Sequence, residues 1–268
     1  MIPLRATLCA THDYHKKMMK KVLKIIGYIL LAIITVAAIA FFKINEKKPV
    51  GVKGDKAEAL AQKMMQAVNK LAWDSTAIVG WTYRGNRHHI WDKQRNLAQV
   101  TWDTHKVLLN LNTLAGKVYD NQEEVRDADK AEKLKQEAYK YFINDAFWLN
   151  PIAKMYDAGV ERSIVTLSDG TEGLLVSYSS GGLTPGDAYL WRVGKNGIPT
   201  SWKLWVKIIP IGGMELSWDN WQTLSTGAKV AALHTGKLTG AVIPLTDIKA
   251  AKSLSEMGLM EDAFEAIQ

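Results

Sequence analysis

The feature that most constrains this chain is an uninterrupted apolar run from Ile25 to Phe42, which carries no charged residue. The run is 18 residues long, close to the shortest helix that spans a bilayer. Lysines flank it on both sides, and those before it are denser and closer. The positive-inside rule therefore places the N-terminus in the cytoplasm and everything after Lys43 outside it. We predict a single-pass membrane anchor with an extracytoplasmic domain.

Two alternatives at this end of the chain stay open. Met18 and Met19 precede Lys20, and a start at either would leave residues 1–17 outside the natural protein. The shorter form has the n-region and h-region of a secretory signal, with a small-residue cleavage site ending at Ala40. We favour an uncleaved anchor because the apolar run is long and continues past that site.

The predicted organisation has four parts. A basic segment, 1–24, leads into the anchor, 25–42, and a polar linker, 43–56, follows it. Residues 57–268 form one domain, which is long enough to bury its own core.

The net charge of +7 is confined to the N-terminal part. Residues 1–56 hold 11 Lys and Arg against three acids, a net of +8, and the remainder holds 23 against 24, a net of −1. The basic residues therefore lie beside the membrane, where anionic lipids attract them. A nearly neutral domain argues against nucleic acid as a partner.

Cys9 is the only cysteine and precedes the apolar run. The domain therefore has no disulfide framework and no cysteine-ligated metal site. Cys9 also cannot be the lipidated cysteine of a lipoprotein signal. We find no cofactor-binding motif and predict no cofactor.

Hydrophobic periodicity predicts an α+β fold. Apolar residues recur at helical spacing and then alternate as in antiparallel strands. We expect a strongly curved antiparallel sheet, an incomplete β-barrel, covered by helices. The expected helices are 57–73, 123–142, 250–254 and 257–267, with strands between 75 and 119 and between 160 and 235, one of them covering 214–224 as a single strand.

All 10 tryptophans lie after residue 56, and several alternate with apolar partners on one face of the predicted sheet. If helices fill that face, these side chains are core. If the sheet curls around a cavity, they bind an apolar ligand and the helix 123–142 acts as a lid. The candidate cavity-lining residues are Trp81, Trp102, Trp191, Trp202, Leu204 and Trp218.

No residue pattern indicates a catalytic residue or a metal site. His88 and His89 are neighbours in a predicted strand, so they face opposite sides and cannot chelate one ion together. His105 and His234 would have to join one of them in space. We interpret all four as structural or surface histidines.

Several short stretches resemble the LolA/LolB-like lipoprotein-carrier superfamily, in an uncharacterised bacterial branch. They are His89–Asp92, Phe142–Leu149 with Pro151 after it, Asp157–Gly159, and Trp218–Gln222. The resemblance covers about Ala57 to Thr235 and implies an incomplete barrel that holds lipid acyl chains under helices. It also implies that the anchor lies in a bacterial inner membrane and that the domain is periplasmic. No family binding residue matches a position here. This chain also departs from the soluble carriers of that family, which move freely, because it has a membrane-spanning anchor.

Three functional hypotheses follow. The favoured one is a membrane-anchored binding protein that holds a lipid, a lipoprotein acyl chain or another apolar ligand without catalysis. The second is a structural or protein-interaction domain of the cell envelope with a filled core. The third is an enzyme acting on envelope lipid or glycan. The sequence makes no prediction of oligomeric state.

Overall fold

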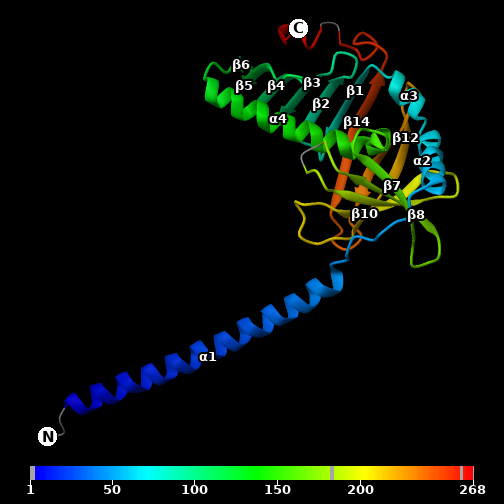
Figure 1. Cartoon of the computed structure of the whole chain (residues 1–268). Coiled ribbons are helices and arrows are strands. Elements are labelled where there is room, and N and C mark those ends of the chain that lie inside the picture. Colours follow the sequence, from blue (N-terminus) through cyan, green and yellow to red (C-terminus); the bar gives the residue numbers. More distant parts are fainter. Residues whose placement is uncertain (1–3, 182–183, 260–261, 268) are drawn as a thin grey trace. The chain divides into compact units, whose positions relative to one another are not determined.

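The computed structural model describes residues 4–181, 184–259 and 262–267, with side chains from Met18 onward except Ala37 and Ala40. The chain forms two compact units, Met1–Glu46 and Lys47–Gln268 (Figure 1). The boundary lies inside the predicted linker.

The first unit is one long helix, α1 (Leu4–Ile44). Its part Met18–Ile44 is long and apolar enough to cross a membrane, and of the helices that the structure describes it alone meets both conditions. The predicted anchor 25–42 lies within it. The identity of the membrane, the direction of crossing and the cleaved alternative stay predictions.

The second unit contains two antiparallel sheets and a few helices, which confirms the α+β class. Among the described residues neither sheet closes into a barrel. The nine-stranded sheet has the order β12 (Asp219–Thr223), β13 (Lys229–Thr235), β14 (Val242–Ala251), β1 (Ile78–Tyr83), β2 (Arg87–Asp92), β3 (Leu97–Trp102), β4 (His105–Asn110), β5 (Gly116–Asp120), β6 (Glu123–Glu124). The five-stranded sheet has the order β11 (Met214–Ser217), β10 (Pro199–Trp205), β9 (Ala188–Val193), β8 (Glu172–Tyr178), β7 (Val160–Thr166).

The chain passes from one sheet to the other at Trp218. We predicted a single strand over 214–224, but β11 pairs with β10 and β12 pairs with β13. Trp218 lies between them and is buried, and its backbone N–H bonds to the carbonyl of Thr200. A large buried side chain at the crossing joins the two sheets through one core.

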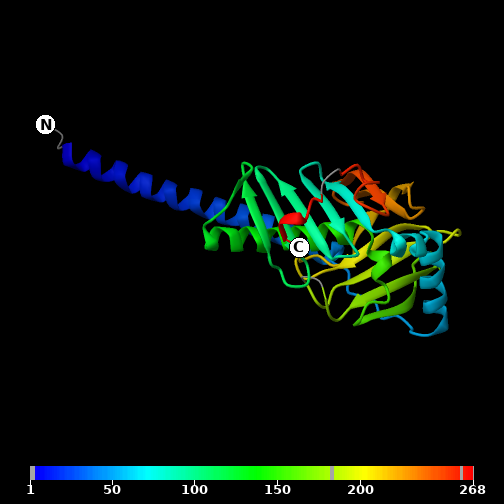
Figure 2. The same cartoon turned by 90° about the horizontal axis from the view of Figure 1, so that it is seen from above.

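The long meander β1–β5 presents one continuous inward face. The register aligns Trp81 with His89, His89 with Val100, Val100 with Val107, and Val107 with Val118. All five side chains are buried. The helix α4 (Ala128–Leu149) packs along this face, as both views show (Figures 1 and 2).

The predicted helix 57–73 is two helices, α2 (Asp55–Ala67) and α3 (Lys70–Ser75). Asn69 separates them in a left-handed conformation with φ of 53°. Asparagine tolerates this conformation, and its side chain accepts a hydrogen bond from the backbone N–H of Ala72. A polar residue inside an apolar pattern is therefore a helix boundary here.

The predicted lid helix is shifted along the chain. Glu123 and Glu124 form the edge strand β6, Asp127 caps the helix, and α4 continues to Leu149. Asn150 then caps the short 3-10 helix η1 (Pro151–Lys154). The shift brings Phe147 onto the helix, where it can face the sheets.

The two C-terminal helices predicted at 250–254 and 257–267 are wrong over the described residues. Residues up to Ala251 belong to β14, and only a short 3-10 turn, η2 (Glu265–Ile267), follows. β14 joins β13 to β1, so tertiary pairing overrides the helical propensity of its alanines. Residues 260–261 and 268 lie outside the described part.

Candidate functional site

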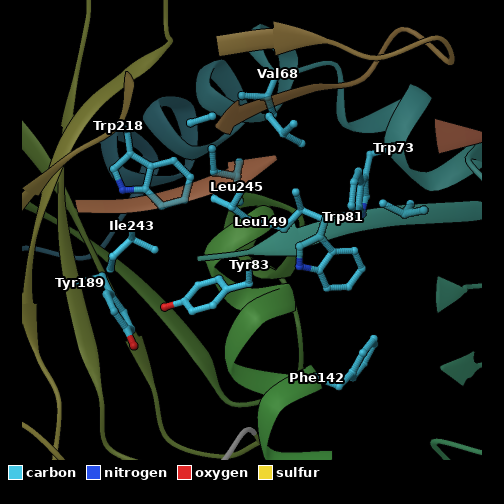
Figure 3. Packing of buried hydrophobic residues seen from close by; sticks show 14 of the residues in the cluster. Val68, Trp73, Trp81, Tyr83, Phe142, Leu149, Tyr189, Trp218, Ile243 and Leu245 are labelled. Atoms are coloured by element: carbon cyan, nitrogen blue, oxygen red, sulfur yellow. The ribbon is translucent and has the colours of Figure 1, made fainter. Parts of the chain in front are cut away.

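All six predicted cavity residues belong to one packed hydrophobic core. Figure 3 shows two of them, Trp81 and Trp218, among other residues of this core. Trp191, Trp202 and Trp218 form a triangle with ring centroids 4.8 to 4.9 Å apart. Trp81, Trp102 and Leu204 are also buried. None of the six belongs to the wall of a cavity of about 770 Å³ that the domain contains. Their predicted contact with a ligand stays a prediction, and their position is that of core.

A cavity of about 770 Å³ lies beside α4 and between the two sheets. This volume is within the range of pockets that hold small organic ligands. Residues from α3, β2, α4, β8 and β9 contribute to its wall. The apolar and aromatic lining residues are Trp73, Trp91, Leu111, Tyr139, Phe142, Ile143, Ala146, Phe147, Ala153, Ala158, Val160, Tyr178, Tyr189 and Ile208.

Three aromatic rings form one side of this wall. Phe147 from α4 lies 5.5 Å from the ring of Tyr178 and 5.1 Å from that of Tyr189. Burial raises the pKa of both tyrosines, and the nearby carboxylates of Asp157 and Asp187 raise it further. The two phenols therefore stay neutral at physiological pH and present flat, uncharged surfaces to the cavity.

Polar residues also line the cavity, and two of them, Asp157 and Asp187, lie near the two tyrosines. Lys154 and Asp157 form an ion pair of 2.8 Å. Asp187, only 6% exposed, accepts hydrogen bonds from the Thr184 hydroxyl and the backbone N–H of Lys207. A mostly apolar cavity with a few polar groups is the usual form of a small-molecule binding site.

The wall that α4 provides is held in place by a buried ion network. Asp145 of α4 accepts from Arg87 Nη2 at 2.8 Å and lies 2.8 Å from His89 Nε2. His89 stacks on Trp81 with centroids 4.5 Å apart. Burial lowers the pKa of His89, which favours the neutral imidazole. The network fixes the helix to β2 at one point of its length.

The other histidines have separate surroundings. His88 is exposed and pairs with Thr82, and His105 lies 3.2 Å from Asp120. His234 is buried against Trp148 and Trp218, where burial lowers its pKa to about 4. In the described ranges no group of three or more His, Cys, Asp or Glu side chains could hold a metal ion. The predicted absence of catalytic and metal residues stays a prediction.

None of the residues that line the cavity was among the six predicted from the sequence to do so. Trp73 and Trp91 come from the helical segment and strand on one side, and Tyr178 and Tyr189 from the other sheet. Phe147 had been placed after the end of the predicted helix. The one available signal was Trp91, which lies two residues after the buried His89 and so faces the same side of β2.

Among known proteins, the chain has a distant structural neighbour. No known protein-family profile matches the chain, and no curated protein matches it. A solved structure of a DUF1329 family protein from Desulfovibrio piger is similar at 11% sequence identity, with a TM-score of 0.41. The alignment covers 80% of this chain and 100% of that protein. A likeness this distant carries no argument about function.

Proposed function

We propose that this protein is a membrane-anchored binding protein that holds an apolar ligand, such as a lipid or a lipoprotein acyl chain, in the cavity beside α4. The observation that carries the proposal is the cavity of about 770 Å³ with its mostly apolar and aromatic wall. No bond is made or broken. The protein acts outside the cytoplasm, attached to the bacterial inner membrane by α1.

The driving force for binding is removal of apolar surface from water. Each Å² buried contributes about 25 cal/mol, so a chain that covers the rings of Trp91, Phe147 and Tyr178 gains several kcal/mol. The wall is preformed, because the rings of Phe147, Tyr178 and Tyr189 support one another. Little ordering is then needed when the ligand binds.

The resemblance to the LolA/LolB-like superfamily supports the same proposal. In that family an incomplete barrel holds acyl chains under helices. Here α4 takes the place of a covering helix, and the ligand lies along it and not against the predicted tryptophan face.

A second candidate is an envelope interaction domain with a filled core. The packing of Trp191, Trp202 and Trp218 favours it, because the face predicted to bind ligand is occupied by the protein itself. The two candidates differ in whether the cavity beside α4 carries a ligand.

Lipid extraction and mass spectrometry separate them. The four hydrophobic clusters of the described residues are built entirely from the unit Lys47–Gln268, so we expect this unit to fold without α1. It would be exported with a cleavable signal and purified without detergent. An apolar molecule in about one-to-one ratio supports the binding protein. A folded, empty domain contradicts it.

A further inference from the structure

The turn between β10 and β11 is unusually apolar for an exposed hairpin. Its residues 206–213 are Val-Lys-Ile-Ile-Pro-Ile-Gly-Gly, with one charge. Val206 and Ile209 pack against the core and anchor the hairpin. Ile208 points outward and is 74% exposed, and Pro210 is also exposed. A single exposed apolar residue needs no explanation, but exposed apolar residues that adjoin a ligand-binding groove are typical of an interaction surface.

Ile208 also belongs to the wall of the cavity. The most exposed apolar side chain of the hairpin is thus continuous with the candidate ligand site. Gly181, which is exposed, also lines the cavity. Exposed residues on the wall mark where the cavity opens to solvent, and we call this region its mouth. Whatever covers the hairpin would be in contact with a ligand that passes through this mouth.

The chain is attached to the five-stranded sheet a few residues after the end of α1. Val52 forms a two-way backbone bridge with Ile164 of β7, with both N–H···O distances 2.8 Å. Lys53 pairs with Glu161 of the same strand. Gly51 fits tightly here, because a Cβ at this position would lie 2.3 Å from Ser163 Oγ. The linker is therefore fixed to the five-stranded sheet at Val52.

The chain between Ile44 at the end of α1 and Val52 makes eight residue steps, which span at most about 29 Å when fully extended. A domain held within this length cannot leave its own bilayer. Lys43, Lys47 and Lys48 in the linker add attraction to anionic lipid. The bilayer is thus the apolar partner present at all times.

We infer that the β10–β11 hairpin lies in the interface of the bilayer that carries α1, and that the cavity exchanges its ligand with that bilayer through the mouth at Ile208. The membrane contact follows from the hairpin and the linker. The exchange rests on the proposed function. In the membrane interface, apolar side chains lie at the boundary between head groups and acyl chains. The ammonium group of Lys207, beside Ile208, lies among the lipid phosphates.

The test uses the full chain in vesicles that contain lipids brominated on the acyl-chain carbons nearest the head group. Cys9 is replaced by serine, and an environment-sensitive fluorophore is attached at Ile208→Cys. The matched control is Leu71→Cys on α3, which is 82% exposed and is not part of the cavity wall. The apolar interface should blue-shift the emission of the label at position 208, and brominated lipid should quench it. The label at position 71 should show neither change.

Equal signals at the two positions would overturn the membrane contact, whether the hairpin is then bare or covered by a protein or a second copy. The ligand content is measured separately, by lipid extraction from the unit Lys47–Gln268 purified without detergent. A loaded cavity with an unquenched position 208 leaves the proposed function standing and removes this inference. A quenched position 208 with an empty cavity keeps the membrane contact and removes the exchange.

Discussion

His89 Nε2 lies 2.8 Å from Asp145 Oδ2, and solvent reaches neither side chain. One residue belongs to β2 and the other to α4, so this contact joins the helix beside the cavity to the sheet that supports it. Arg87 supplies the compensating charge to the same carboxylate. Asn144 also donates to it, so the buried carboxylate has three side-chain partners. Such a network positions the helix specifically, because removing the carboxylate leaves unpaired polar groups in the core.

Asp145→Asn should therefore destabilise the domain strongly. The amide keeps the size of the carboxylate but removes the charge that Arg87 and His89 face. Breaking a buried ion pair typically costs about 3–5 kcal/mol, and we expect the free energy of unfolding in urea to fall by about that amount. Asp129→Asn, an exposed position on the same helix, is the control. A loss at Asp145 no larger than at Asp129 would mean that the network does not hold α4.

The buried His234 makes stability depend on pH. Burial lowers its folded-state pKa to about 4, while the unfolded chain has the ordinary value near 6.5. Between these two pH values the unfolded state binds more protons than the folded state. The contribution of neutral His234 to the free energy of unfolding is therefore fully present above pH 6.5 and falls as the pH drops towards 4. The difference corresponds to about 3 kcal/mol.

His234→Gln should flatten this part of the stability profile, which urea unfolding at a series of pH values measures. His88→Gln, at an exposed position, should leave the slope as it is in the wild type. A slope that survives in His234→Gln would assign the acid sensitivity to other groups, with His89 the first candidate because burial lowers its pKa as well.

Trp202 and Tyr178 should separate core from cavity wall. Trp202→Ala removes a fully buried ring from the aromatic triangle, and such truncations cost about 3–5 kcal/mol of stability. Tyr178→Ala opens the wall of the cavity and should weaken retention of the apolar ligand more than it lowers stability. Calorimetry and ligand extraction on both variants check this. If Trp202→Ala lost more ligand than Tyr178→Ala, and Tyr178→Ala lost more stability, the tryptophan face and not this cavity would be the ligand site.

The α+β class, the apolar helix and the strand meander could be predicted because each depends on local periodicity. The position of the cavity could not. Alternation shows that Trp81, Trp202 and Trp218 face inward, but not whether a helix fills the space opposite them. That depends on α4 ending at Leu149 and on the chain changing sheets at Trp218, which are tertiary events. β14 was missed for the same reason, because its pairing with β1 is not local.

The most direct test of the account fills the cavity. Ala146 on α4 lines it, and Ala128 is exposed at the start of the same helix. Ala146→Trp and Ala128→Trp of the unit Lys47–Gln268 would be purified without detergent, and the bound apolar molecules counted by mass spectrometry beside the wild type. Our account predicts about one ligand per chain in the wild type and in Ala128→Trp, and a large loss in a folded Ala146→Trp. Equal ligand content in all three, or none in any, would contradict it.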